Sequence, residues 1–397
     1  MIADRYTDYM YGLIDRVMKE IGPRESCSEE ERALGRLFAE EVAPVCETVE
    51  TERFTCSPKA FVGFFPYLVL LYVVGVVLYF FLPAVSAVLS LIGGAVLFLE
   101  VVRYKEFIDP FFPSKEGENV VGTVRPSREA TGRVYVSAHF DSAYEFKIWY
   151  WFKGFSSVLM GIAFLSVVLL FGSGLARAIV EGMGLPQAAA FKVLGWVLVG
   201  VSPVVILFAF FHTKDVVPGA MDDMAGVAVC AGLARYLADA RSGEGFYPEH
   251  TEVVLLGLSS EEAGLRGAKR FAAAHLDDPL PAAGIFLDGI YDERFFTIFK
   301  RELWPGAVLD PELVELAGRA AREGGFEAKV SVLPLGATDA SAFALAGIPS
   351  VSMCLWDAGR LVPHYHTRHD TIEHIKPGSL AVALQTVINM LERWDGS

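Results

Sequence analysis

Residues 134–142 read Val-Tyr-Val-Ser-Ala-His-Phe-Asp-Ser, an apolar run that ends in a histidine and an aspartate. Val134 to Ala138 is typical of a buried β-strand, so His139 and Asp141 stand where that strand ends. Similar runs occupy residues 253–258, 284–287 and 350–353. Helical stretches cover residues 225–238, 262–274, 311–323 and 377–394. This alternation predicts an α/β fold in which helices flank a mainly parallel central sheet.

Further acidic and histidine residues follow apolar or turn-like segments. They are Asp222 and Asp223 after Pro-Gly-Ala-Met, Glu261 and Glu262 after Ser-Ser, Asp288 after Ile-Phe-Leu, and His366 in Tyr-His-Thr. Parallel strands deliver such side chains to one edge of an α/β sheet. Imidazole and carboxylate are the ligands that zinc takes at hydrolytic sites. The set therefore predicts a two-metal hydrolase.

Each motif also has a plainer interpretation. The pairs at 222–223 and 261–262 suit the acidic first turn of a helix, which Ser259 or Ser260 would cap in the second case. His366 has His364 and His369 nearby, as in a solvated histidine cluster. Asp288 differs, because a carboxylate at the end of an apolar strand is costly unless it is paired or bound to metal. The order and the total of the motifs, rather than any single one, indicate the metal site.

In this order, the motifs resemble the M28 family of zinc aminopeptidases, which are co-catalytic di-zinc exopeptidases. The matching pieces are residues 138–142, 219–223, 260–265 and 287–288, the stretch from Thr338-Asp339 through Phe343 to Pro349, and Tyr365-His366-Thr367 with Asp370-Thr371. Gly22-Pro23-Arg24 also looks like the N-terminal segment of the family. The resemblance covers nearly all of the polar chain and leaves out the long apolar segments.

The resemblance implies two Zn²⁺ ions and a role for each matching position. His139 and Asp288 would hold one zinc, Glu262 and His366 the other, and Asp222 would bridge both. Glu261 would be the general base for attack by a zinc-bridging water on an N-terminal peptide bond. Asp141 would orient His139, and Asp339 would position the substrate or support the ligands. The chain departs from the family at Asp223, where Asn is usual, and at Ala225, where Ser is common.

Two other functions are compatible with a fold of this kind. The first is glutaminyl cyclisation, an acyl transfer that similar folds perform with one zinc. The second is a non-catalytic membrane scaffold or chaperone, and such proteins tend to lose metal ligands. This chain keeps every predicted ligand together with Glu261, which favours a zinc aminopeptidase that acts on peptide substrates.

The long apolar segments predict that the protein is embedded in a lipid bilayer. Residues 60–99 contain no charged side chain, and mean hydropathy over the whole chain is +0.40. That stretch has room for two spans of about 20 residues each, with a turn near Pro83. A second pair covers residues 154–172 and 193–211. We therefore expect four transmembrane helices, inserted as two hairpins into one enzyme domain.

Charge and cysteine content predict the side of the membrane. Lys and Arg flank the spans on the enzyme side, at Arg53, Lys59, Arg103, Lys105, Lys147, Lys153 and Lys214, whereas the hairpin tips offer Arg177 and Lys192. The positive-inside rule then places the catalytic domain in the cytoplasm. No secretory signal is visible, and five widely spaced cysteines without a CxxC pattern agree with free thiols in a reducing compartment.

These observations predict a division of the chain into five segments. Residues 1–58, 103–148 and 214–397 would form the peptidase domain, while residues 59–102 and 149–213 would form the transmembrane hairpins. A helix over the first 20 or so residues ends at Gly22-Pro23. The formal net charge of -14 argues against nucleic acid as a partner.

Overall fold

The computed structural model describes residues 1–357 and 364–396, which form two compact units. The first unit comprises Met1–Pro58, Ser114–Tyr144 and Asp215–Ser397. The second comprises Lys59–Pro113 and Glu145–Lys214. The chain therefore leaves the first unit twice and returns to it each time.

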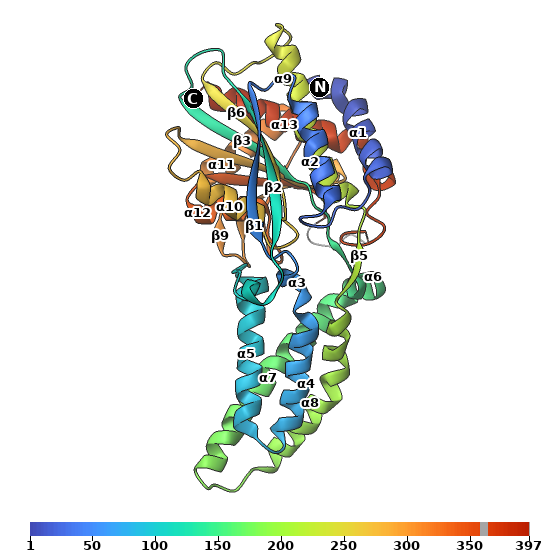
Figure 1. Ribbon diagram of the computed structural model, residues 1–397, viewed down its shortest axis with the longest axis vertical. Coiled ribbons are helices and arrows are strands. Elements are labelled where there is room, and N and C mark those ends of the chain that lie inside the picture. Colours follow the sequence, from blue (N-terminus) through green and yellow to red (C-terminus); the bar gives the residue numbers. More distant parts are fainter. Residues whose placement is uncertain (358–363, 397) are drawn as a thin grey trace. The chain divides into compact units, whose positions relative to one another are not determined.

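A nine-stranded sheet organises the first unit (Figure 1). Its central strands β6 (Thr251–Leu258), β3 (Gly132–His139), β7 (Ala282–Ile290) and β11 (Ser350–Leu355) are parallel neighbours. Antiparallel pairing adds β2 (Lys115–Val124) and β1 (Thr48–Cys56) beyond β6, and β8 (Phe296–Glu302) beyond β11. The strand β10 (Lys329–Leu333) runs parallel to β8, and β9 (Ala307–Val308) also pairs with β8. The predicted strands are all present, and the parallel centre is confirmed.

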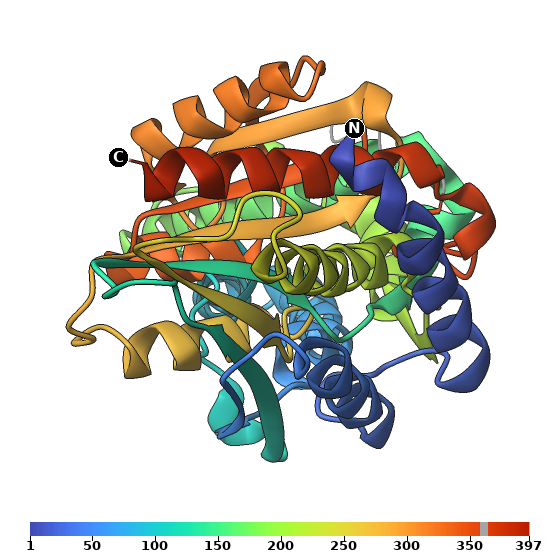
Figure 2. The same ribbon diagram turned by 90° about the horizontal axis from the view of Figure 1, so that it is seen from above.

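Helices cover both faces of this sheet (Figure 2). One face carries α9 (Ala225–Arg241), α11 (Pro311–Glu323) and α13 (Pro377–Asp395), with α1 (Thr7–Glu20) and α2 (Glu29–Val42) packed against α9. The other face carries α10 (Arg266–Ala274) and α12 (Asp339–Ala346). Because both faces are covered, the central strands are apolar along most of their length. The predicted α/β class is confirmed.

The helix expected over residues 262–274 begins later than its sequence indicates. Gly264 and Leu265 have φ values of 92° and 61°, in the left-handed region, so the helix starts at Arg266. The amide of Arg266 donates to the carbonyl of Ser260 at 3.0 Å and closes a tight turn. Glu261 and Glu262 therefore lie in a turn between β6 and α10, and not in the first turn of a helix.

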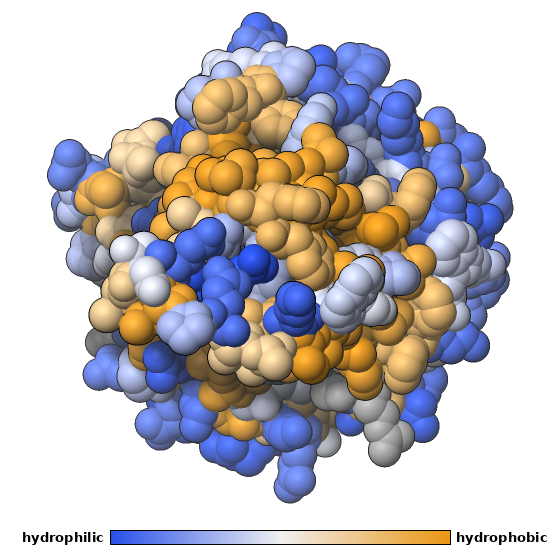
Figure 3. Space-filling view, turned by 90° about the horizontal axis from the view of Figure 1, so that it is seen from below, coloured by the Kyte–Doolittle hydropathy of each residue, from blue (hydrophilic) through white to orange (hydrophobic). Residues whose placement is uncertain are grey.

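The second unit is a bundle of apolar helices. Its elements are α3 (Ala60–Gly63), α4 (Phe65–Tyr79), α5 (Pro83–Leu97), α6 (Lys147–Phe152), α7 (Ser156–Gly182) and α8 (Ala189–Leu207). Four helical stretches are long and apolar enough to cross a membrane: Ala60–Tyr79, Pro83–Val102, Lys147–Gly182 and Ala189–Phe210. Many of their large apolar side chains are exposed, and the view from below shows hydrophobic residues gathered toward the centre, with hydrophilic residues among and around them (Figure 3).

The helix α7 extends beyond the predicted span of residues 154–172 and ends at Gly182. This extension places Arg177 on the helix, where its guanidinium donates to the carbonyls of Tyr79 and Phe80 at 2.6 and 3.2 Å. Those carbonyls end α4 and have no partner within that helix. Arg177 thus satisfies two backbone carbonyls at the end of α4. The remaining short elements are the paired strands β4 (Tyr144–Phe146) and β5 (His212–Val216). Short helical turns complete the described residues: η1 (Ile2–Tyr6), η2 (Phe98–Val102), η3 (Asp109–Phe111), η4 (Lys153–Phe155), η5 (Phe208–Phe210), η6 (Ala220–Met224), η7 (Glu293–Phe295) and η8 (Ile372–His374).

The ring of Phe140, the residue after β3, leaves no space for a side chain at Gly257 on the neighbouring strand β6. A Cβ atom added there would overlap the ring of Phe140, which is fully buried and packs edge-on against Phe38. Gly257→Ala should therefore lower the free energy of unfolding by about 1–3 kcal/mol. The midpoint of thermal unfolding of the detergent-solubilised chain measures this loss. Gly132→Ala, with its nearest atom at 3.6 Å, is the matched control, and an equal midpoint for the two variants would contradict the packing argument.

Candidate metal centre and catalytic carboxylates

The predicted site residues meet at one edge of the sheet, within the first unit. His139 is the last residue of β3, Asp288 lies near the end of β7, and Glu261 and Glu262 lie in the turn that follows β6. These three strands are parallel neighbours, so their carboxyl ends share an edge. Asp222 precedes α9 and His366 lies in a turn after β11.

Asp222 stands between the two histidines. Its Oδ1 lies 3.1 Å from Nε2 of His139, and its Oδ2 lies 3.1 Å from Nε2 of His366. The same nitrogen of His366 is 3.2 Å from Oε1 of Glu262. The two oxygens of one carboxylate therefore face two different imidazoles, which is the arrangement a bridging ligand requires.

The donor atoms form two groups that share Asp222. In each group one ligand atom per residue lies within 4.8 Å of the others: His139, Asp222 and Asp288 in the first, and Asp222, Glu262 and His366 in the second. A third group contains His139, Glu261 and Glu262. The structure thus brings together all five residues predicted as ligands, and places Glu261 beside them.

The charge of this cluster suits divalent cations. Two imidazoles share the edge with the carboxylates of Asp141, Asp222, Asp223, Glu261, Glu262, Asp288 and Asp339. Burial and mutual repulsion raise the pKa values of Glu261 and Asp288 well above the usual range. Burial disfavours protonation of His139, but hydrogen bonds to Asp141 and Asp222 outweigh it and raise its pKa. So much buried negative charge is stable only when protons or metal ions compensate it, and the mixed N/O donor set fits zinc.

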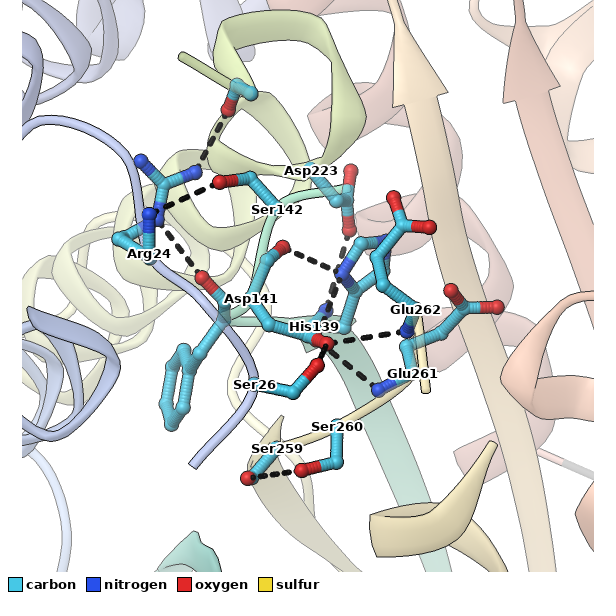
Figure 4. Close-up of polar contacts among 12 residues, drawn as sticks. Arg24, Ser26, His139, Asp141, Ser142, Asp223, Ser259, Ser260, Glu261 and Glu262 are labelled. Atoms are coloured by element: carbon cyan, nitrogen blue, oxygen red, sulfur yellow. Dashed lines mark hydrogen bonds and ion pairs between the residues drawn. The ribbon is translucent and has the colours of Figure 1, made fainter. Parts of the chain in front are cut away.

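Asp141 acts on the site through both its backbone and its side chain (Figure 4). Its backbone carbonyl lies 3.0 Å from Nδ1 of His139, whereas its carboxylate Oδ1 is 3.4 Å from that nitrogen. The carboxylate accepts hydrogen bonds from the amides of Glu261 and Glu262 at 3.0 and 3.1 Å, and from Ser26 at 2.5 Å. The orientation of His139 thus comes chiefly from the carbonyl, while the carboxylate holds the turn that carries the two glutamates.

Two further aspartates position the ligands through backbone amides. Asp370 accepts from the amides of Met221 and Asp222 at 2.7 and 3.3 Å, and burial raises its pKa to about 7. Asp223, which follows a cis peptide bond, accepts from the amides of His139, Gly226 and Gly289 at 3.2–3.3 Å. These contacts need acceptor atoms only, which a carboxylate supplies at the position where Asn is usual.

Arg24 is the residue that sequence reasoning left without a role. Its fully buried guanidinium donates to the carbonyls of Gly22, Phe140, Pro218 and Gly219 at 2.8–3.0 Å. It thereby joins the N-terminal segment to the segments that carry His139 and Asp222 (Figure 4). The motif Gly22-Pro23-Arg24 could have drawn attention to this residue, but the motif does not predict which carbonyls the arginine binds.

Asp339 begins α12 and lies behind the ligand cluster. Its Oδ1 is buried and has no hydrogen-bond partner among the described residues, and burial raises its pKa to about 7. The loop before it is held by Glu302, whose carboxylate accepts from the amide and hydroxyl of Thr338 and from the hydroxyl of Ser341 at 2.6–2.8 Å. Glu302 therefore sets the start of α12.

The burial of Glu302 predicts a pH dependence of stability. Burial raises its pKa from 4.5 to about 7. The folded state therefore binds more protons than the unfolded state between these values, and the free energy of unfolding falls as the pH rises through this window, by an amount on the order of 3 kcal/mol. In Glu302→Gln this loss should disappear, because the amide stays neutral while its oxygen and NH₂ can still bond Thr338 and Ser341.

Thermal unfolding midpoints between about pH 5 and pH 8 measure this difference. The control is Glu315→Gln, an exposed glutamate paired with Arg319 on the surface of α11, which should follow the wild type. If Glu302→Gln loses as much stability with rising pH as the wild type does, then Glu302 does not ionise in this window.

Comparison with known proteins agrees with the motifs. The model of Peptidase family M28 matches residues 198–391. None of the curated proteins matches the chain. The resemblance to family M28 is confirmed, and it supports a metallopeptidase in general.

Solved structures share the fold at low sequence identity. A Zn-dependent exopeptidase from Parabacteroides distasonis is 16% identical, with a TM-score of 0.55 and 97% of each chain covered. The zinc aminopeptidase BSAP from Bacillus subtilis is 15% identical, with a TM-score of 0.57 and coverage of 98% of this chain and 95% of that chain. A glutaminyl cyclase from Bacteroides thetaiotaomicron is 15% identical, with a TM-score of 0.55 and 97% of each chain covered. The chain therefore has a zinc aminopeptidase-like fold.

Proposed function

We propose that this chain, which resembles family M28 in sequence and fold, is a membrane-anchored di-zinc aminopeptidase that hydrolyses N-terminal peptide bonds. The observation that carries the proposal is the position of Asp222, with one carboxylate oxygen 3.1 Å from each of two histidines. Asp222, Glu262 and His366 alone already supply the three protein ligands that one catalytic zinc takes, and His139 with Asp288 forms a further group around the same Asp222. The donor groups on either side of Asp222 therefore favour two metal ions.

In this proposal each half of the cluster holds one zinc. His139 and Asp288 form one half, Glu262 and His366 form the other, and Asp222 belongs to both. Bound there, zinc would polarise the scissile carbonyl and lower the pKa of water at the site. The free α-amine of a peptide adds a neutral donor that suits a site of this charge.

Glu261 is the proposed general base. Its carboxylate joins His139 and Glu262 in one donor group, and burial raises its pKa above the usual range. A raised pKa suits a group that takes a proton from water and then returns it to the leaving amine. Asp141 fixes the amides of Glu261 and Glu262, so that the base stays beside the ligands.

Glutaminyl cyclisation is the second candidate, because a glutaminyl cyclase from Bacteroides thetaiotaomicron shares the fold. Metal content separates the two functions. Cyclisation on a similar fold needs one zinc, whereas the complete donor set around Asp222 favours two. The same complete set argues against a non-catalytic scaffold.

Replacement of the base tests the peptidase mechanism. Glu261→Gln should retain about two zinc ions per chain, because the ligands are unchanged, while hydrolysis of aminoacyl substrates falls by at least about 100-fold. Zinc is counted by anomalous scattering or by elemental analysis, and turnover is measured on N-terminal aminoacyl substrates. The control Glu327→Gln, exposed and outside the cluster, should match the wild type in both measurements. Full turnover in Glu261→Gln would overturn the assignment, and one tight zinc would favour the cyclase.

Membrane anchoring rests on the four apolar helices and on their flanking charges. We propose that the second unit spans the bilayer and that the catalytic domain faces the cytoplasm, because Lys and Arg are concentrated at the span ends nearest the peptidase segments in the chain. The protein should stay with membranes during alkaline carbonate extraction. Release into the supernatant would contradict the anchoring.

Orientation is tested with two engineered thiols. A membrane-impermeant maleimide should label Gln187→Cys, in the loop between α7 and α8, in intact cells. It should label Arg128→Cys, an exposed position between β2 and β3, only after lysis. The unmodified chain gives the background from native cysteines. Labelling of Arg128→Cys in intact cells would contradict the proposed orientation and place the catalytic domain on the outer side of the membrane.

A further inference from the structure

Two of the five cysteines lie side by side behind the catalytic turn. The sulfur atoms of Cys27 and Cys56 are 3.6 Å apart, and each residue is 4% exposed. All five cysteines are free thiols in the structure. The proposed mechanism uses none of them, so these two adjacent thiols have no assigned role.

Cys27 belongs to the short segment that connects the N-terminus to the site. Its neighbour Ser26 donates to the carboxylate of Asp141, and Ser28 caps α2. The amide of Cys27 donates to Oε2 of Glu31 at 2.7 Å. Cys56, the last residue of β1, approaches from the edge of the sheet. The pair therefore brings the segment before α2 into contact with the end of β1.

The pair is connected to Glu261 through Ser260. The sulfur of Cys27 lies 3.2 Å from the hydroxyl of Ser260. The amide of Ser260 donates to Oε1 of Glu31 at 2.9 Å, so that one buried carboxylate holds both Cys27 and Ser260. Figure 4 shows Ser260 directly before the two glutamates whose amides Asp141 binds. A displacement of Cys27 therefore acts on the turn that carries the proposed base.

We propose that Cys27 and Cys56 are a redox-modifiable pair that hydrogen peroxide converts to a disulfide, and that this oxidation slows the peptidase by displacing Ser260 and the turn that follows it. The effect on turnover rests on the proposed function, whereas disulfide formation does not.

The oxidation balances with peroxide as the only oxidant. The Cys56 thiolate attacks one peroxide oxygen, an S–O bond forms, the O–O bond breaks, and the leaving hydroxide takes a proton to become water. The sulfur of Cys27 then attacks the sulfur of Cys56, an S–S bond forms, the S–O bond breaks, and the leaving hydroxide takes the proton of Cys27. Two thiols lose two electrons in total, and one peroxide becomes two waters.

Cys56 is the better first nucleophile. The hydrogen bond from Cys27 lowers the pKa of the Cys56 thiol, and the positive charge of Arg266 acts in the same direction. The same hydrogen bond and burial raise the pKa of Cys27, which suits the resolving thiol.

Closure of the bond must shorten the distance between the two sulfurs, and any part of that movement made by Cys27 alters its contact with Ser260. A disulfide has an S–S distance of about 2.05 Å, so the sulfurs approach each other by roughly 1.5 Å. Because the single S–H of Cys27 is donated to Cys56, the hydroxyl of Ser260 is the donor in the 3.2 Å contact with the Cys27 sulfur, and this contact changes when that sulfur moves into the disulfide. A misplacement of about 1 Å at a catalytic group can lower a rate by as much as about 100-fold. We therefore expect turnover in the oxidised form to fall by about tenfold or more.

The experiment uses the full chain in detergent, treated with hydrogen peroxide and then denatured for a thiol count and peptide mapping. The expected result is a fall from five thiols to three, a linked peptide pair containing Cys27 and Cys56, and recovery of thiols and turnover after dithiothreitol. Cys56→Ser should form no disulfide and keep its rate under peroxide. Cys230→Ala, a matched removal of a buried cysteine that lies on α9, should still form the disulfide.

Hydrogen exchange of the amides in residues 259–265 gives a readout that does not depend on activity. Exchange should be faster in the oxidised wild type than in oxidised Cys56→Ser, because the contacts of Ser260 are disturbed. Five remaining thiols, or a linked pair with another cysteine, would overturn the proposed pair. A disulfide that leaves both turnover and exchange unchanged would overturn the coupling to the turn. Absent turnover in the reduced protein would instead contradict the proposed peptidase function.

Discussion

The concentration of buried carboxylates at one edge of the sheet is the constraint on which the site depends. Seven carboxylates, with that of Asp141 included, share this edge with two imidazoles, and Asp222 lies between the imidazoles. Side chains of one charge repel each other strongly when water is excluded. The cluster is therefore stable only with bound cations or protons. For the same reason, the pKa values of Glu261 and Asp288 are raised well above the usual range. In the proposed function, a divalent metal on each side of Asp222 would compensate this charge and would supply the chemistry of hydrolysis.

The positions of the ligands are set by backbone contacts rather than by side chains alone. The carboxylates of Asp141, Asp223 and Asp370 each accept backbone amides next to a ligand or the base. Arg24 acts as a donor instead, because its guanidinium donates to the backbone carbonyls of Phe140 and Gly219, near His139 and Asp222. Acidic side chains outside the predicted ligand set thus still support the site, because they hold the turns on which the predicted ligands lie.

The N-terminal segment is part of this support. Residues between α1 and α2 provide Arg24, the hydroxyl of Ser26 and the thiol of Cys27, while α2 provides Glu31, and each contacts a segment of the site more than 100 residues away in the chain. A structural change in this segment can therefore alter the position of the proposed base without directly altering the predicted metal ligands. The redox pair at Cys27 and Cys56 is placed to use this route.

The sequence by itself determined the α/β class, the parallel centre of the sheet, the apolar helices and the residues of the candidate site. Local patterns carry this information, because strand ends, apolar runs and their order are properties of the chain. Only the tertiary structure decided that Glu261 and Glu262 lie in a turn, that the carbonyl of Asp141 faces His139, and that Arg24 and the Cys27–Cys56 pair lie behind the site. The contacts of Arg24 and of the cysteine pair join segments that are apart in the sequence, and such contacts leave no periodic signal in either segment. The turn at Glu261 and the contact between Asp141 and His139 are local, but they depend on backbone angles and a ring orientation that the apolar pattern does not encode.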